Sequence, residues 1–170
     1  MNDLQFYEEL YALKTTLRRG WQRVGVEGRA ESDAEHTFSM MLAALTIMAH
    51  ADTGLDQLRV LKMIAYHEMG EIDVGDITPH DGVSAADKHQ RELAAIERLA
   101  AQYRLPEMLA LWQEFEEAQS PEAKFVKALD KYDAFRQAQV YEHRGLAPEG
   151  TADEFYRGAS ALIDFITGIC

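Results

Sequence analysis

The chain has 170 residues, of which 47% are hydrophobic and 27% charged, an ordinary composition for a globular domain. Its net charge of −12 argues against a nucleic acid polymer or an anionic membrane surface as a partner. The single cysteine, Cys170, allows no intrachain disulfide and favours a reducing compartment. The chain opens without the basic and apolar regions of a signal peptide, and its longest apolar run, Met40 to Ala49, is too short to span a bilayer. We therefore expect a cytoplasmic protein with no membrane partner.

Apolar residues follow a helical period almost throughout the chain, and no segment alternates convincingly as a strand would. Helix starts are marked by a capping box at Ser32 and Glu35 and by N-cap serines at Ser84 and Ser120. A basic irregular segment around residues 18–29 and an acidic loop at 70–83 separate expected helices. The expected helices cover about 4–17, 32–49, 56–69, 84–103, 121–141 and 152–169, with one more opened by Pro106. The prediction is an all-α fold of about six or seven helices in one domain over residues 1–170.

His67 and Glu68 stand side by side in the helix expected at 56–69. On a helical wheel of about 100° per residue, Glu68 falls in the middle of the apolar stripe. His67 projects from the edge of that stripe, and Glu71 lies one turn further on. An isolated buried carboxylate is costly, so Glu68 must be protonated, paired with a cation or bound to a metal.

His36 shares the inward face of the preceding helix, so two imidazoles and a carboxylate converge on the core. Such donors bind divalent metals. Two plainer alternatives stand beside this reading: an inward histidine is more often a hydrogen-bonded core residue, and Glu68 could pair with a buried arginine. A fourth ligand is ambiguous, because Asp130 and Asp133 lie equally close to the apolar face of their helix.

Several motifs resemble one family of enzymes. They are SDAEHTFSM around His36, HEMGEIDVGDITP around the doublet, KHQRE, LALWQEFEEAQSPEAKFVK, and AKFVKALDKYD around Asp130. This ordered set is similar to the histidine–aspartate (HD) domain metal-dependent phosphohydrolases, and more narrowly to their 5′-deoxynucleotidase branch, the HD-domain-containing protein 2 group. The resemblance extends from about Leu13 to Glu142, so the HD core is expected at about 13–142. It implies hydrolysis of deoxyribonucleoside 5′-monophosphates, and it implies a homodimer.

The resemblance also implies which residues carry the chemistry. It implies metal ligation by His36, His67, Glu68 and Asp130, and so it selects Asp130 over Asp133.

Three further roles follow from the same motifs. Glu71 matches the family's acid beside the attacking water, and Asp76 matches a second acid at the substrate. An arginine just before Trp21, either Arg18 or Arg19, matches a phosphate contact.

One position departs from the family's pattern, since Glu68 stands where the family has aspartate. The extra methylene moves the carboxylate by about 1.5 Å, and we expect it to retune the metal site rather than abolish it. The donor set favours Mn²⁺ or Co²⁺ over Ca²⁺, and Mg²⁺, Zn²⁺ and Fe²⁺ also fit. The alternative functions are hydrolysis of another nucleotide phosphoester and a catalytically silenced helical binding module.

Other residues in these motifs have plainer expectations. Lys88, His89 and Arg91 are expected to decorate an exposed helix face, although KHQRE matches the family. Trp112, Phe115 and Phe155 are expected either in the monomer core or at a dimer interface.

Overall fold

A computed structural model gives the structure of residues 3–78 and 80–167, so Cys170 lies outside the described residues. Within these ranges the chain forms helices and no strand, apart from one antiparallel bridge between Leu17 and Ser32. The helices are α1 (Asp3–Thr15), α2 (Arg19–Arg23), α3 (Asp33–His50), α4 (Gln57–Tyr66), α5 (Glu71–Val74), α6 (Ala85–Tyr103), α7 (Pro106–Glu117), α8 (Pro121–His143) and α9 (Thr151–Thr167). The all-α prediction is confirmed, and the seven helices longer than α2 and α5 agree with the predicted number.

The predicted helix starts are confirmed wherever a serine side chain caps the helix. The Ser32 hydroxyl accepts from the Glu35 backbone N–H, and the Glu35 carboxylate accepts from the Ser32 N–H, which completes the capping box of α3. Ser84 and Ser120 accept the corresponding N–H groups at the starts of α6 and α8. These starts were predictable because capping depends only on residues a few positions apart.

Three predicted boundaries need correction. The acidic loop expected at 70–83 begins with the short helix α5, and the basic segment contains the short helix α2. The helix expected to reach residue 69 ends at Tyr66, and His67 is its C-cap. In each case the chain keeps a helical turn for a few residues next to a glycine, a local detail that apolar periodicity does not reveal.

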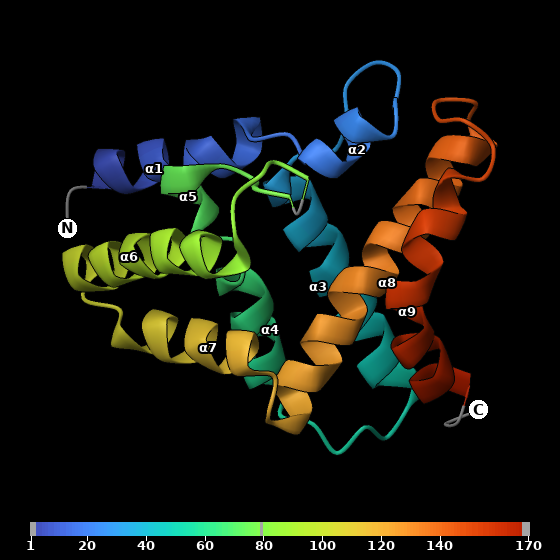
Figure 1. Ribbon diagram of the computed structural model, residues 1–170. Coiled ribbons are helices and arrows are strands. Elements are labelled where there is room, and N and C mark those ends of the chain that lie inside the picture. Colours follow the sequence, from blue (N-terminus) through green and yellow to red (C-terminus); the bar gives the residue numbers. More distant parts are fainter. Residues whose placement is uncertain (1–2, 79, 168–170) are drawn as a thin grey trace.

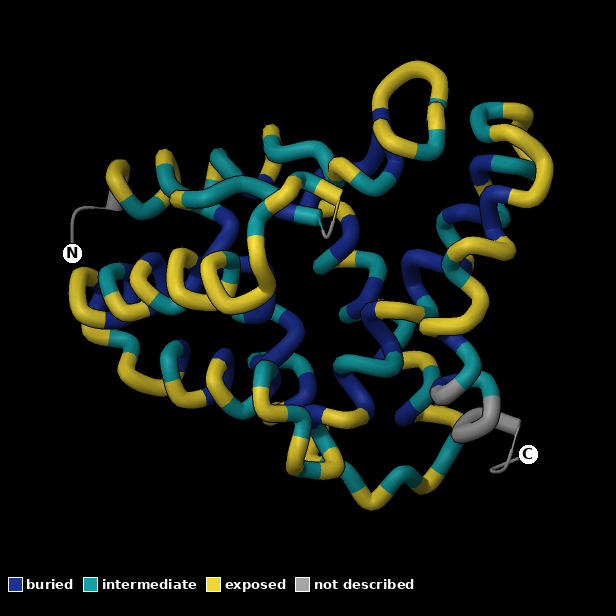
Figure 2. The backbone as a smooth tube through the Cα atoms, viewed as in Figure 1, coloured by how far each residue is buried: buried dark blue, intermediate teal, exposed yellow. Residues whose placement is uncertain are grey.

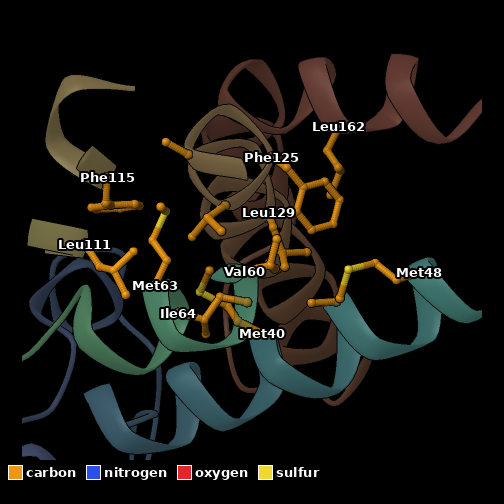
Figure 3. Packing of buried hydrophobic residues seen from close by; sticks show 13 residues of the cluster. Met40, Met48, Val60, Met63, Ile64, Leu111, Phe115, Phe125, Leu129 and Leu162 are labelled. Atoms are coloured by element: carbon orange, nitrogen blue, oxygen red, sulfur yellow. The ribbon is translucent and has the colours of Figure 1, made fainter. Parts of the chain in front are cut away.

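Two groups of helices flank the central pair α3 and α4 (Figure 1). On one side α8 and α9 pack along each other, and on the other α6 packs against α7 while α5 rests on α6. Side chains from α3, α4, α7 and α8 fill the main core between them, as Figure 3 shows for Met40, Ile64 and Leu129. Full burial of such a side chain contributes roughly 1.5–3 kcal/mol. The core therefore fixes α3, α4 and α8 firmly against one another.

Burial is greatest where these three helices meet, and the outer turns of α6 and α7 are exposed (Figure 2). Trp112 and Phe115 are 2% and 5% exposed, so both belong to the monomer core. None of the described helices has the length and apolar content needed to cross a membrane.

Candidate metal centre and adjoining cavity

The doublet lies where α4 ends rather than inside it. His67 keeps a helical backbone (φ −63°, ψ −32°) as the C-cap, and the following turn leads directly into α5. His67 and Glu68 are both buried, at 7% and 8% exposure. The wheel therefore predicted the inward direction correctly, because the chain continues to turn past the end of the helix.

The hydrogen bonds of His67 define which nitrogen can bind a ligand. Its Nδ1 lies 2.7 Å from the carbonyl oxygen of Ile64, and a carbonyl only accepts, so Nδ1 carries the proton. The lone pair is then on Nε2, which is buried and makes no hydrogen bond to any described residue, although Glu68 Oε1 lies 3.3 Å away. A buried nitrogen lone pair without a partner fits a metal ligand, and a backbone carbonyl behind the ring is a usual support for one.

Asp130 and Asp133 lie at opposite edges of the His36 imidazole. Asp133 Oδ2 is 2.8 Å from Nδ1, and Asp130 Oδ1 is 3.2 Å from Nε2, the edge nearer to Glu68. Ser39 Oγ also donates to Asp133, at 2.7 Å. Although burial and the nearby Arg18 lower it, hydrogen bonds to both aspartates raise the pKa of His36 to about 9. The ring is thus held from behind by Asp133 and faces Asp130 with its other nitrogen.

The donor atoms converge on one point. His36, His67 and Glu68 each offer one atom, and these atoms lie within 4.8 Å of one another. Glu68 Oε1 is 3.8 Å from His36 Nε2, and Asp130 adds a carboxylate next to that nitrogen. Two imidazole nitrogens and two carboxylates form a donor set that a divalent first-row metal accepts. This is a buried candidate metal site.

A second set of donors shares His36. Glu31, His36 and Asp133 also have atoms within 4.8 Å of one another. Here, however, Glu31 Oε2 accepts from Trp21 Nε1 at 3.0 Å, and Asp133 accepts from both Ser39 and His36. Hydrogen bonds therefore engage this group, so it supports the rings of His36 and Trp21.

Of the two arginines before Trp21, only Arg18 turns its side chain to the cluster. Its Nη1 donates to Glu68 Oε1 at 2.6 Å, and its Nη2 lies 3.8 Å from Asp130 Oδ1. The Arg19 side chain is 53% exposed and pairs with Asp81. The alternative that Glu68 pairs with an arginine is therefore correct for the contact with Arg18. That pair leaves His67 Nε2 without a partner, so it does not account for both imidazoles.

The two acids of the segment after the doublet occupy different surroundings. Glu71 is 4% exposed, and burial together with repulsion from Glu68 and Asp33 raises its pKa to about 12. Asp76 lies at the cavity and accepts a 2.6 Å hydrogen bond from the Arg19 backbone N–H. Asp33, which the sequence did not single out, is fully buried at the start of α3, and burial followed by repulsion from Glu68 raises its pKa to about 7. Carboxyl groups are crowded together here, as they are around a cation site, and this crowding together with burial favours the protonated forms of Glu71 and Asp33.

Six of these side chains line one side of a cavity of about 390 Å³, a size that suits a small molecule. The residues on this side are Arg18, His67, Glu68, Glu71, Asp76 and Asp130.

Comparison with known proteins identifies the fold. The HD domain family model matches residues 10–164. The chain belongs to the HD-domain family. It is 38% identical to 5′-deoxynucleotidase hdd1 of Schizosaccharomyces pombe over 146 residues (82% of this chain, 72% of the relative). It is also 38% identical to 5′-deoxynucleotidase HDDC2 of Danio rerio over 158 residues (91% and 76%), and 36% identical to the Homo sapiens HDDC2 over 156 residues (90% and 74%).

Two solved structures share this fold over nearly the whole chain. A conserved hypothetical protein from Pyrococcus furiosus superposes with a TM-score of 0.76 at 26% identity, covering 96% of this chain and 99% of that one. A predicted metal-dependent phosphohydrolase from Magnetospirillum magnetotacticum superposes with a TM-score of 0.70 at 27% identity, covering 98% and 90%. The resemblance inferred from the motifs is thereby confirmed.

The residues on the other side of the cavity require one correction to the exposed helix face that was expected on α6. Lys88 is only partly exposed, and both Lys88 and His89 line the cavity, whereas the exposure predicted for His89 and Arg91 is confirmed. Trp112, Phe115, Glu116 and Lys127 line it as well. Sequence reasoning missed this side because its residues come from α6, α7 and α8, which meet only in the folded chain. The KHQRE and LALWQEFEEAQSPEAKFVK motifs were the available signal.

Proposed function

We propose that this HD-domain protein is a metal-dependent 5′-deoxynucleotidase that hydrolyses deoxyribonucleoside 5′-monophosphates to nucleoside and phosphate. The observation that carries the proposal is the unpartnered, buried Nε2 of His67, which faces Glu68 at a cavity that also contains Arg18 and Glu71. The relatives named 5′-deoxynucleotidase, at 36–38% identity, support the same reaction.

In this proposal four side chains hold the cation: His36, His67, Glu68 and Asp130. The donor set favours Mn²⁺ or Co²⁺, with Mg²⁺, Zn²⁺ and Fe²⁺ also compatible. When bound, a divalent cation supplies Lewis-acid activation of water and neutralises charge on the phosphoryl group. Asp133 and the Ile64 carbonyl hold the two imidazoles by their far nitrogens, so both rings present Nε2 to the same point.

Arg18 and Glu71 act on the reacting groups. The Arg18 guanidinium binds the phosphate, because its donors already point at the carboxylates beside which the phosphate would lie. Glu71 accepts the proton of the attacking water. Burial and the surrounding carboxylates raise its pKa, and a cation held by the neighbouring ligands would lower that pKa and make the carboxylate a competent base.

Asp76 acts near the leaving oxygen or the sugar of the substrate in this scheme. Its orientation toward the cavity is maintained by the Arg19 N–H, a backbone group that needs no particular side chain at position 19. Arg19 itself pairs with Asp81 away from the cluster, which supports Arg18 as the phosphate contact.

The remaining expectations concern the whole protein. A single HD domain over residues 1–170, a cytoplasmic location and a homodimer are part of the proposal. The dimer is supported by apolar side chains on the outer face of α3, where Phe38, Leu42 and Leu45 are 63%, 51% and 43% exposed.

The test combines metal content with turnover. The purified protein is stripped with a chelator and reloaded with Mn²⁺, Co²⁺ or Mg²⁺, and bound metal is quantified by elemental analysis. Phosphate release is then measured with deoxyribonucleoside and ribonucleoside 5′-monophosphates and with nucleoside polyphosphates. The proposal expects one metal ion per chain and fastest release from the deoxyribonucleoside monophosphates. Phosphate release from polyphosphates alone would favour the alternative that the protein hydrolyses another nucleotide phosphoester. No phosphate release with any metal would favour the alternative that it is a catalytically silenced binding module.

Glu68 is the sharpest single position to vary. Glu68→Asp restores the family's residue, and a strong rise in activity would show that glutamate attenuates the enzyme. Glu68→Gln keeps the length of the side chain but removes its charge, so it should lose metal and activity. If Glu68→Gln retained both, Glu68 would not be a ligand.

A further inference from the structure

Two motifs that carry no role in the proposed reaction meet in one wall of the cavity. His89 comes from KHQRE on α6, whereas Trp112 and Glu116 come from LALWQEFEEAQSPEAKFVK on α7. All three line the same cavity as the candidate metal centre. We propose that they form the subsite for the nucleobase of the substrate, an inference that rests on the proposed nucleotidase function.

The wall offers a flat ring for stacking. The His89 imidazole lies against the Trp112 indole, with ring centroids 5.3 Å apart and planes inclined by 28°. Trp112 is almost fully buried, and the His89 side chain is 46% exposed. The indole packs against the imidazole, and both residues line the cavity. Bases of all kinds stack on such rings, because each base has a π face.

The same wall offers a polar edge. Glu116 Oε2 lies 3.2 Å from His89 Nδ1, and Glu116 Oε1 accepts from Lys127 Nζ at 2.7 Å. A carboxylate acceptor and an ammonium donor therefore stand together beside the stacking ring. The edge of a purine or pyrimidine carries donors and acceptors, which such a pair can meet.

The wall lies at a suitable place relative to the metal centre. Lys127 Nζ is 3.9 Å from the centroid of the Phe115 ring, and that ring lies 5.3 Å from the ring of the candidate ligand His67. One aromatic side chain thus separates the proposed reaction centre from the proposed base subsite. A mononucleotide has the same order of parts, with the sugar between phosphate and base.

The charges favour the base over the phosphate at this wall. Glu116 is paired with Lys127 and Glu92 with Lys88, so these charges largely offset one another and offer a phosphate little net attraction. The Arg18 guanidinium stands on the side of the cavity that holds the candidate ligands. A neutral planar ring needs no net charge at its binding site. Because stacking tolerates every base, the subsite should bind purines and pyrimidines with moderate differences between them.

The competing explanation is structural, since the His89–Glu116 contact also joins α6 to α7. The experiment therefore compares substrates with and without a base. The ratio kcat/KM is measured for deoxyribonucleoside 5′-monophosphates and for 2-deoxyribose 5-phosphate, which keeps the sugar and phosphate but lacks the base. His89→Ala is expected to lower kcat/KM about tenfold or more for the nucleotides and to leave the base-free substrate unchanged.

Two further variants make the result specific. His89→Phe keeps a ring for stacking and should recover most of the nucleotide activity. Arg91→Ala, exposed on the same helix, should change neither substrate. An equal loss on both substrates with His89→Ala would overturn the subsite, as would full activity on nucleotides.

Binding of a deoxynucleoside separates the two proposals. If the wild-type protein hydrolyses no monophosphate, the proposed function fails, yet calorimetry with a deoxynucleoside and with 2-deoxyribose still tests the wall. The subsite requires that the deoxynucleoside bind more tightly than the sugar and that His89→Ala weaken that binding about tenfold. Equal binding of the two compounds by the wild-type protein would overturn it.

Discussion

The two sides of the cavity are built by different means. On one side His67 and Asp130 are both 7% exposed and are positioned by α4 and α8, two helices of the main core. On the other side the Lys88 and Lys127 side chains are 34% and 33% exposed and are paired with carboxylates. Burial makes each polar contact on the first side costly to lose, whereas solvent screens the pairs on the second. Substitutions should therefore have large effects on the buried side and small effects on the open side.

The largest effect is expected from Asp130→Asn, which keeps the shape of a buried side chain but removes a ligand charge. If Asp130 binds the metal, phosphate release should fall by more than about 100-fold and bound metal should drop. Elemental analysis and phosphate release on the same preparation measure both. Retention of metal at the wild-type stoichiometry would remove Asp130 from the ligand set.

Asp133→Asn is the matched substitution on the far edge of the same imidazole. Asp133 only holds the His36 ring through Nδ1, so the metal should still bind, with about 10–100-fold lower affinity. Activity should return when excess metal is added, unlike that of Asp130→Asn. If the two variants behaved in the opposite way, Asp133 would be the metal ligand and Asp130 the residue that holds the His36 ring.

Gly70→Ala tests how closely the buried side is packed. A Cβ at position 70 would lie 3.0 Å from the Cβ and 3.3 Å from the Cα of Glu92, and neither atom belongs to a flexible side-chain end. The expected loss is about 1–3 kcal/mol of unfolding free energy, together with lower activity because Glu68 and Glu71 lie on either side of this glycine. Denaturant unfolding measures the loss. Gly20→Ala, where a Cβ would meet nothing within 4 Å, is the stability control.

The smallest effect is expected from Lys88→Met on the open side. The ammonium donates to the Ile77 carbonyl at 2.8 Å and lies 3.3 Å from Glu92, so its removal should cost roughly 1 kcal/mol. Activity should fall only a few-fold, because the chain that carries Asp76 loses one tether. Lys62→Met, which removes a surface pair with Glu107, should leave thermal unfolding unchanged. A loss as large as that of Gly70→Ala would contradict the proposed difference between the two sides.

Local features of this protein were predictable from the order of its residues. The capping box of α3, the serine caps of α6 and α8 and the inward direction of His36 and His67 all depend on separations of a few residues. The end of helix α4 at Tyr66 was not predicted, because the turn that follows keeps nearly the same side-chain directions as the helix. The inward direction predicted for His67 was therefore correct, although the predicted end of its helix was wrong.

Contacts between segments far apart in the sequence could not be predicted and are seen only in the folded chain. Periodicity placed Asp130 and Asp133 on one helix face, but the crossing of α3 and α8 decides which edge of His36 each one meets. The path of the chain before α2 likewise turns Arg18, and not Arg19, toward Glu68.

The sequence by itself determined the helical fold, the family and the residue types of the candidate metal site, because these follow from local periodicity and motifs. Only the tertiary structure decided which nitrogen of each histidine faces the cluster and that His89, Trp112 and Glu116 share its cavity. The physical reason is that helix packing sets side-chain neighbours across dozens of residues, whereas sequence patterns describe neighbours within a turn or two.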